Sequence, residues 1–381
     1  MAESGGGSRE MRHDLRRLTN RAWLFRLLAA VVAFTAMVCT ASACTVGVTG
    51  HRPSPPPGGP PRPPELDAAS EVWPEATFTV PSSLGGEPTV QPVAILGANQ
   101  VLMVAPLSTR PRFVTYDLRT GRHRVLATAP EWSDCDLCFE IRSVAVSETR
   151  ITWTAGIYRS EPWNAGKRHV ELWTMPRSGG RMRLVTWLTG HGDLPFHDEL
   201  TVDEDQALWR DEARAYRIPL SGGKAMEVPF TTGMPPAPQP DPDLDDQVCG
   251  VEWCVGRVPP RAYELTTMVV RRRDGSGRVT VPASSGGPLI GDRFGLFGLP
   301  YVYGPGPVEI FSDGPESAAV LYDRCAGTSA LVGAQGKKDR SHEITQGASV
   351  PGEPILFWMQ QDEKRYTVLD LARVPDQPCG R

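Results

Sequence analysis

Two stretches of the chain carry residue types that could do acid–base or metal chemistry. The segment from His191 to Glu199 offers His191, Asp193 and His197 as candidate catalytic residues. Their spacing matches no recognised motif, so a solvated loop is the alternative, and no metal ion is expected. The run from Asp241 to Asp246 resembles a cation-binding loop. It lacks the glycine and the bidentate glutamate of an EF-hand, which favours a solvated acidic surface.

The cysteines form a second group of reactive residues. Of eight cysteines, Cys39 lies in an expected leader and Cys44 directly follows it, which leaves six. An even number in an exported chain is typical of disulfide bonds. For Cys135 and Cys138, a local structural disulfide is our prediction, while a swapped structural pairing, redox chemistry or zinc binding stay open. The other predicted pairs are Cys249–Cys254, across a hairpin, and Cys325–Cys379, between a strand end and the C-terminal tail.

Established catalytic signatures do not accompany these residues. The sequence contains no G-x-S-x-G elbow, no H-E-x-x-H, no Walker loop and no G-x-G-x-x-G after a predicted strand, and we expect no cofactor. Lys and Arg total 40 against 44 Asp and Glu, without a basic stripe interleaved with aromatic residues. Binding to nucleic acid is therefore not expected.

Residues 1–43 have the features of an export signal. Arginines precede the apolar run Leu27 to Val38, which is shorter than the roughly 20 residues of a membrane-spanning helix. The run ends at Ala41-Ser42-Ala43-Cys44, an A-x-A cleavage site that also resembles a lipobox, in which the cysteine receives the lipid. We expect an extracytoplasmic protein that is held on the cell membrane by lipid at Cys44. Plain secretion and an uncleaved anchor are the alternatives.

Residues 44–75 are expected to form a disordered linker. From His51 to Glu65 the sequence is nearly all Pro, Gly and Arg. Such a segment cannot pair as a strand and favours an extended polyproline II spacer. A stalk that holds a domain off the membrane is the functional interpretation, and a leader remnant is the alternative.

A repeat organises residues 76–381 and must position the candidate residues. Its clearest copy is Phe113 to Gly121, a strand that runs into a glycine turn. Successive copies are spaced by roughly 45 to 60 residues, the period of a four-stranded propeller blade. With 38 Gly and 37 Pro, the chain also favours short strands joined by turns. The sequence therefore predicts an all-β, six-bladed β-propeller. The other copies are Leu172 to Gly180, Ala215 to Gly223, Met268 to Gly277, Ala319 to Gly327 and Tyr366 to Leu371.

The strands predicted in the last two blades leave the sixth blade incomplete. The sixth lacks a fourth strand before the chain ends, and Thr77 to Val80 resembles Val279 to Val281 in the outer strand of the fourth blade. A proline follows both, as an outermost strand tolerates. We predict that Thr77 to Val80 completes the sixth blade. The strands expected in the last two blades are Phe294–Leu296, Val308–Phe311, Ala319–Tyr322, Ala330–Val332, His342–Thr345, Ile355–Met359 and Tyr366–Leu369.

The strand followed by Ser-Gly-Gly or Thr-Gly resembles the repeats of six-bladed TolB-like, WD40-like propellers over residues 76–371. The leader and Pro-rich stalk resemble those of exported actinobacterial lipoproteins. The Ser-Pro-Asp-Gly turn common in TolB repeats is absent, and the separate amino-terminal domain of TolB has no counterpart. The resemblance implies the fold, and no TolB activity or partner carries over.

In a propeller, two sets of loops gather on one face, around the central channel. They connect outer strands to the next inner strands, and second strands to third strands. Aromatic rings there could stack on sugar or peptide, although wedging between blades is the alternative. We expect a non-enzymatic surface module for a protein, peptide or glycan of the envelope. The alternative is a hydrolase or lyase that uses the His191 segment at the channel mouth. The residues expected on the ligand face are Trp132, Tyr158, Trp163, Arg257 and Tyr263.

Overall fold

The computed structural model of the 381-residue chain describes residues within the unit Ser54–Arg381. The described ranges are 61–86, 89–105, 111–129, 139–157, 169–189, 199–210, 214–229, 238, 240–303, 318–333, 344–349 and 354–379. No helix in these ranges combines the length and the apolar character of a membrane span.

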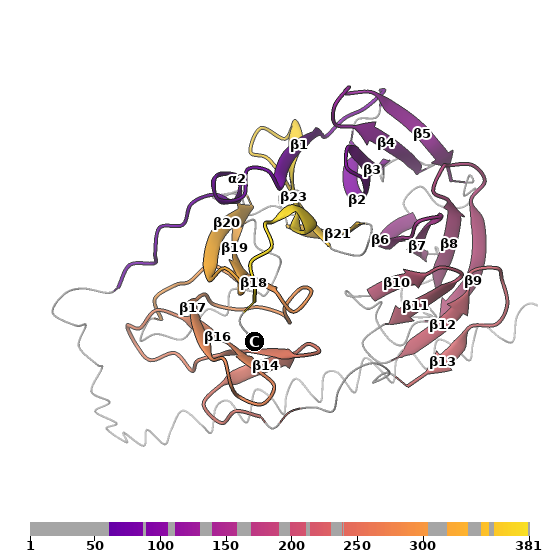
Figure 1. Ribbon diagram of the computed structural model, residues 1–381. Coiled ribbons are helices and arrows are strands. Elements are labelled where there is room, and N and C mark those ends of the chain that lie inside the picture. Colours follow the sequence, from indigo (N-terminus) through magenta and orange to yellow (C-terminus); the bar gives the residue numbers. More distant parts are fainter. Residues whose placement is uncertain are drawn as a thin grey trace, which may run out of the picture. The chain divides into compact units, whose positions relative to one another are not determined.

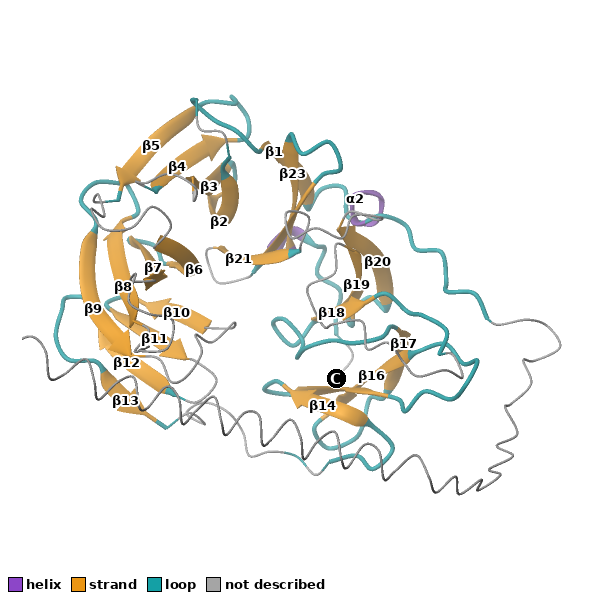
Figure 2. Ribbon diagram, turned by 180° about the vertical axis from the view of Figure 1, so that it is seen from behind, coloured by secondary structure: helices purple, strands orange, loops and turns teal. Residues whose placement is uncertain are grey.

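Antiparallel sheets of three or four strands follow one another along the chain (Figures 1 and 2). Blade one contains β2 (Gln91–Gly97), β3 (Gln100–Ala105), β4 (Arg112–Asp117) and β5 (His123–Thr128). Blade two contains β6 (Phe139–Val146), β7 (Arg150–Ile157), β8 (His169–Pro176) and β9 (Arg183–Thr189). Blade three contains β10 (Glu199–Asp203), β11 (Gln206–Arg210), β12 (Ala215–Pro219) and β13 (Met226–Val228). Blade four contains β14 (Asp245–Cys249), β15 (Trp253–Arg257), β16 (Thr267–Arg272) and β17 (Val279–Pro282). Blade five contains β18 (Phe294–Gly298), β19 (Ala318–Asp323) and β20 (Thr328–Gly333). Blade six contains β21 (Thr345–Ser349), β22 (Ile355–Met359), β23 (Arg365–Asp370) and β1 (Thr77–Pro81).

The first strand of the domain completes the last blade, as predicted. β1 pairs antiparallel with β23, with Thr77 opposite Leu369 and Val80 opposite Tyr366. At the inner side of the same blade, β21 pairs parallel with β2 and joins blades six and one in one eight-stranded sheet. The protein is therefore a six-bladed β-propeller in which the two ends of the domain share a sheet.

In three of the six repeats, an aspartate shapes the turn after the third strand. In blade one, Asp117 Oδ1 accepts hydrogen bonds from the backbone N–H groups of Arg119 and Thr120. In blade five, Asp323 Oδ1 accepts from the backbone of Cys325. Asp370 accepts in the same way from Ala372 in blade six. A short carboxylate that bonds backbone groups two or three residues ahead favours a turn over a longer strand. These three aspartates occupy one column of the repeat found in the sequence.

Apolar clusters fill the spaces between consecutive blades. Leu102, Phe113 and Trp153 lie in the cluster between blades one and two, where the rings of Phe113 and Trp153 are 4.6 Å apart. Trp209 packs between blades two and three. Further clusters join blade four to five, five to six and six to one. Each such side chain, when fully buried, stabilises the fold by about 1.5–3 kcal/mol, so the blades depend on one another.

The expected strand order of blade five was wrong. β18 pairs directly with β19, from Phe294 opposite Asp323 to Gly298 opposite Ala319, so Val308–Phe311 does not lie between them. That segment itself lies outside the described residues. The inner edge of β18 is instead bonded by the chain that follows β17, because the Ser284 N–H donates to the Gly298 carbonyl (3.1 Å).

In blade six, the inner strand begins at Thr345, where the predicted strand His342–Thr345 ended. The pairing with β2 explains this position. A Cβ atom at Gly347 would lie 2.6 Å from the Val93 carbonyl oxygen, so only glycine permits this close approach. The close contact at Gly347, and not strand propensity, therefore determines where the inner strand lies.

The end of the expected linker belongs to the domain. Helix α2 (Ala69–Val72) buries Ala69, and Trp73 packs beside it in the cluster of blades five and six. The Asp67 carbonyl accepts a hydrogen bond from the Leu331 N–H (2.8 Å), which adds this segment in parallel to the edge of β20. Residues 66–75 thus pack on the sheets, although the sequence placed them with the disordered residues.

Two of the three predicted disulfides are present among the described residues. Cys249 and Cys254 face each other across the β14–β15 hairpin. Cys325, at the end of β19, is bonded to Cys379 in the tail. The predicted pair Cys135–Cys138 lies outside the described ranges and stays a prediction.

Candidate ligand-binding site

Strand ends of blades four and five meet at one rim. β15 ends at Arg257, opposite the first residue of β14, and β16 begins opposite Pro282, the last residue of β17. The connection from Val258 to Thr266 therefore emerges at this rim. β18 ends at Gly298, whose N–H donates to the Ser285 carbonyl just after β17 (2.9 Å). The segment 299–303 consequently leaves blade five at the same rim, which we call the Tyr rim.

The two segments of the Tyr rim hydrogen-bond to each other. The Tyr263 N–H donates to the Tyr303 carbonyl (2.7 Å), and the Tyr303 N–H donates to the Glu264 carbonyl (3.0 Å). The Thr266 N–H donates to the Tyr301 carbonyl (2.9 Å), while the Thr266 hydroxyl accepts from the Tyr301 N–H (3.0 Å). Backbone bonds therefore hold three tyrosines on one short ladder, and Tyr301 is 41% exposed.

Tyr263 has an unusual backbone conformation. Its φ of 67° lies in the left-handed region, which bulky side chains rarely adopt. Such a conformation costs on the order of 1–3 kcal/mol, and residues that keep it are often found in binding sites. Here the bond from Tyr263 to Tyr303 fixes the residue in this conformation.

Arg257 lies at the end of β15, directly before the connection that forms part of the Tyr rim. Its guanidinium contacts the Asp246 carboxylate at 2.8 Å and that of Asp245 at 4.0 Å. Asp246 has a positive φ of 50°, so this turn is also held in a conformation that most residues avoid. Arg257 is a predicted ligand-face residue, and the carboxylates of Asp245 and Asp246 in the same blade balance its charge.

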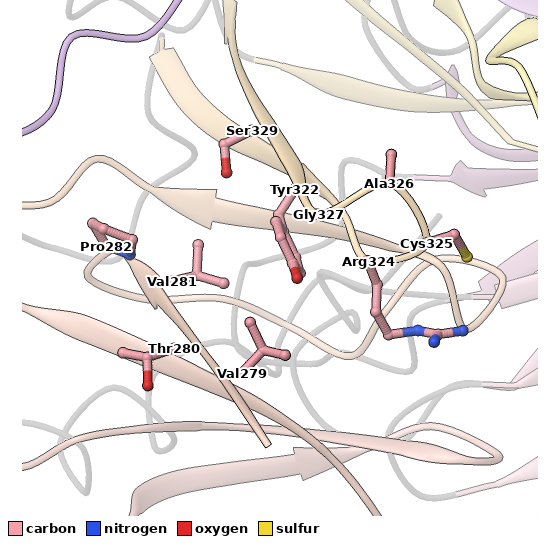
Figure 3. A pocket seen from close by; sticks show the side chains of 10 residues that line it. All are labelled: Val279, Thr280, Val281, Pro282, Tyr322, Arg324, Cys325, Ala326, Gly327 and Ser329. Carbon is pink, nitrogen blue, oxygen red and sulfur yellow. The ribbon is translucent and has the colours of Figure 1, made fainter. Parts of the chain in front are cut away.

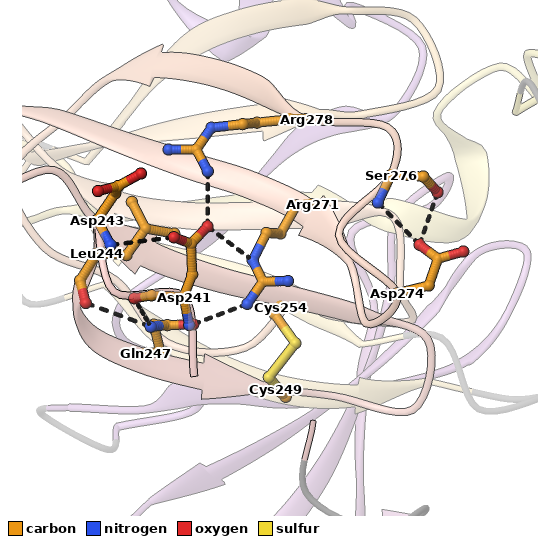
Figure 4. Close-up of polar contacts among 10 residues, drawn as sticks. All are labelled: Asp241, Asp243, Leu244, Gln247, Cys249, Cys254, Arg271, Asp274, Ser276 and Arg278. Atoms are coloured by element: carbon orange, nitrogen blue, oxygen red, sulfur yellow. Dashed lines mark hydrogen bonds and ion pairs between the residues drawn. A yellow bond between two sulfur atoms is a disulfide. The ribbon is translucent and has the colours of Figure 1, made fainter. Parts of the chain in front are cut away.

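The acidic run before β14 is neutralised by arginines. Figure 4 shows Asp241 between Arg271 and Arg278, at 3.5 Å and 2.6 Å. The backbone N–H of Asp243, together with these two guanidinium groups, holds the pKa of Asp241 below its usual value. The Gln247 side chain ties the run to Arg271 (2.9 Å). In the described ranges, no three His, Cys, Asp or Glu side chains gather as metal ligands. Asp241 is thus held against blade four, whereas Asp243, Asp245 and Asp246 are exposed, as predicted for a solvated acidic surface.

The Tyr rim includes residues that the sequence analysis did not single out. Tyr301 and Tyr303 were missed because the expected strand order of blade five placed them in an ordinary connection. The alternation Tyr301-Val302-Tyr303 is a strand signal that could have located them. Of the predicted ligand face, Arg257 and Tyr263 lie at this rim. The other predicted site residues lie outside the described ranges and stay predictions: Cys44, Trp132, Tyr158, Trp163, His191, Asp193 and His197.

Several solved structures are similar to this chain. The chain is 11% identical to an oligogalacturonate lyase in complex with manganese, over 73% of this chain and 76% of that one, with a TM-score of 0.34. It is 11% identical to TolB from Acinetobacter baumannii, over 74% of this chain and 54% of that one, with a TM-score of 0.28. It is also 11% identical to the β-propeller domain of the trilobed protease from Pyrococcus furiosus, over 74% of this chain and 95% of that one, with a TM-score of 0.30.

The chain thus spans about half the length of TolB. No protein-family model and no curated protein matches the sequence. These similarities concern the fold alone, and the propeller assignment stands on the pairing of the sheets themselves.

Proposed function

We propose that the protein is an exported, non-enzymatic binding module of the cell envelope, held on the membrane by lipid at Cys44. In this proposal the Tyr rim contacts a protein, peptide or glycan. The backbone ladder between Tyr263 and Tyr303 carries the proposal, because it fixes aromatic side chains at a strand-end surface before any ligand arrives.

Tyrosine suits such a surface. Its ring offers a large, rigid contact area at a low cost in side-chain entropy, and its hydroxyl can donate or accept a hydrogen bond. A strained position such as Tyr263 is maintained only where the surrounding structure holds it. At the entry to the rim, the Asp246 carboxylate is paired with Arg257.

The experiment compares binding to glycan and peptide arrays by the propeller and by a Tyr301→Ala/Tyr303→Ala variant. We expect the variant to lose the ligands that the wild type retains, with at least a tenfold fall in affinity. Met226→Ala is the matched control, because Met226 is 52% exposed on β13 and lies outside the Tyr rim. Equal binding by the wild type and the tyrosine variant would sink the proposal.

The membrane attachment is tested in the same cells. We expect Cys44→Ala to release the protein into the medium, and the intact mass of the wild type to include an added lipid. Wild-type protein whose mass shows no lipid would contradict the anchor while leaving the binding test standing.

A further inference from the structure

A pocket of about 560 Å³ opens between the outer strand of blade four and the β19–β20 turn of blade five (Figure 3). One wall is strand β17, with the side chains of Val279, Val281 and Pro282. Val279 is 39% exposed here. The pocket therefore joins an apolar wall on one blade to a polar turn on the next. Its Pro282 end borders the Tyr rim, and Arg324 lies at the opposite end of the strands.

Arg324 marks one end of this pocket, and Pro282 and Ser329 lie toward the other end (Figure 3). The guanidinium of Arg324 stacks over the ring of Trp253, with its central carbon 3.9 Å from the ring centroid. Its Nε–H donates to the Asp292 carbonyl (3.0 Å). These two contacts fix the plane of the guanidinium and leave its two Nη groups as the remaining donors.

A second arginine concentrates positive charge at the same end. Arg272 also stacks on Trp253, at 5.2 Å from the ring centroid. Among the described residues, neither Arg272 nor Arg324 has a carboxylate within 4.0 Å. Asp292 and Glu252 act on Arg324 only from a longer distance. The two guanidinium groups on one indole have no close counter-ion. They therefore produce a local positive potential that attracts an anion.

The pocket also contains a hydroxyl donor. Tyr322 is buried, and Figure 3 shows its hydroxyl oxygen turned into the pocket between the two walls. Burial raises the pKa of Tyr322, so this hydroxyl keeps its proton at neutral pH. The pocket thus offers a cation at one end, a donor near the middle and an apolar wall along β17.

We propose that this pocket binds a small organic acid, with its anionic group on the Nη donors of Arg324 and its apolar body along Val279, Val281 and Pro282. The planar end of a guanidinium matches a carboxylate, sulfate or phosphate oxygen pair. The apolar wall favours a ligand with a short hydrocarbon part over an inorganic anion. The anion-binding end at Arg324 lies at the strand end opposite the Tyr rim, and this proposal does not depend on the proposed function.

The experiment titrates the purified propeller with hexanoate, acetate, inorganic phosphate and inorganic sulfate by calorimetry at constant ionic strength. We expect saturable binding of hexanoate that is at least five times tighter than binding of acetate. We also expect Arg324→Gln to weaken hexanoate binding at least tenfold. The control Arg365→Gln removes an exposed arginine of blade six and should change the affinity less than twofold.

A second variant leaves the stacked arginines intact. Val279 is exposed and lines the pocket, so Val279→Glu places a carboxylate inside it and should abolish hexanoate binding. Circular dichroism checks that both variants fold. No saturable binding of hexanoate, equal affinity for hexanoate and sulfate, or unchanged affinity in either folded variant would overturn the proposal. Variants of the Tyr rim should bind hexanoate as the wild type does.

Discussion

Tyrosines occupy two different environments in this propeller. Tyr301 is exposed on a strand-end ladder, where both its ring and its hydroxyl can meet a ligand. Tyr366 is buried between blades six and one, edge-on to the ring of Phe357 at a centroid distance of 6.0 Å. In our proposal the first environment serves recognition, and the second serves packing. Burial of Tyr366 opposes ionisation of its phenol.

Alkaline pH gives a direct test of the buried environment. Burial raises the pKa of Tyr366 to about 12, from 10.0 in the unfolded chain. The folded state therefore keeps the proton that the unfolded state loses, so the free energy of unfolding falls as the pH rises from about 10 to about 12. We expect the wild type to lose about 1 kcal/mol more than Tyr366→Phe between about pH 8 and about pH 11.

Urea denaturation at the two pH values measures this difference, and each protein serves as its own reference. The phenylalanine keeps the packing against Phe357, so the variants should be similar near neutral pH. An identical loss of stability in the two proteins at high pH would show that Tyr366 is not buried as described.

At the scale of elements, the two disulfides fasten loops of very different size. The sequence separation is 54 residues for Cys325–Cys379 and 5 for Cys249–Cys254. In the chain-entropy model, closing these loops stabilises the fold by about 4 and about 2 kcal/mol. The tail is also held by Arg293, which pairs with Asp376 (3.1 Å). That ion pair is exposed on one side and adds little.

Paired substitutions separate the two contributions. We expect Cys325→Ala/Cys379→Ala to lower the free energy of unfolding by about 2–4 kcal/mol, and Cys249→Ala/Cys254→Ala to lower it by about half as much. Urea denaturation under oxidising conditions provides both values. A larger loss from the short loop than from the long one would contradict the assignment of the tail to blade five.

The sequence predicted elements best where local signals and the repeat agreed. The strand before Asp117 was found because apolar alternation, a turn residue and a repeat column coincide there. The closing strand at Thr77 was found because it resembles the outer strand of blade four, with a proline at the end of both. Blade five was misread because β18 pairs with β19 across a long connection, which no local pattern encodes. The Tyr rim was only half found for the same reason. Its ladder depends on contacts between two segments far apart in the sequence.

At the scale of the whole molecule, the domain depends on its first strand. β1 contributes Val80, which is fully buried in the cluster of blades six and one. The neighbouring segment adds Ala69 and Trp73 to the cluster of blades five and six. One short stretch of chain thus supports three blades, and it lies directly after the expected membrane stalk. Loss of β1 would expose the edge of β23 and uncover both clusters.

The pairing of β1 with β23 is the central claim, and a disulfide trap tests it most directly. Thr79 and Thr367 are direct partners in the register, so cysteines at both positions are within bonding distance. We predict that Thr79→Cys/Thr367→Cys forms the cross-link under mild oxidation, as peptide mass analysis would show, whereas the out-of-register control Thr77→Cys/Thr367→Cys does not. Absence of the bond in the first pair, or equal yields in both, would contradict a propeller closed by its N-terminal strand.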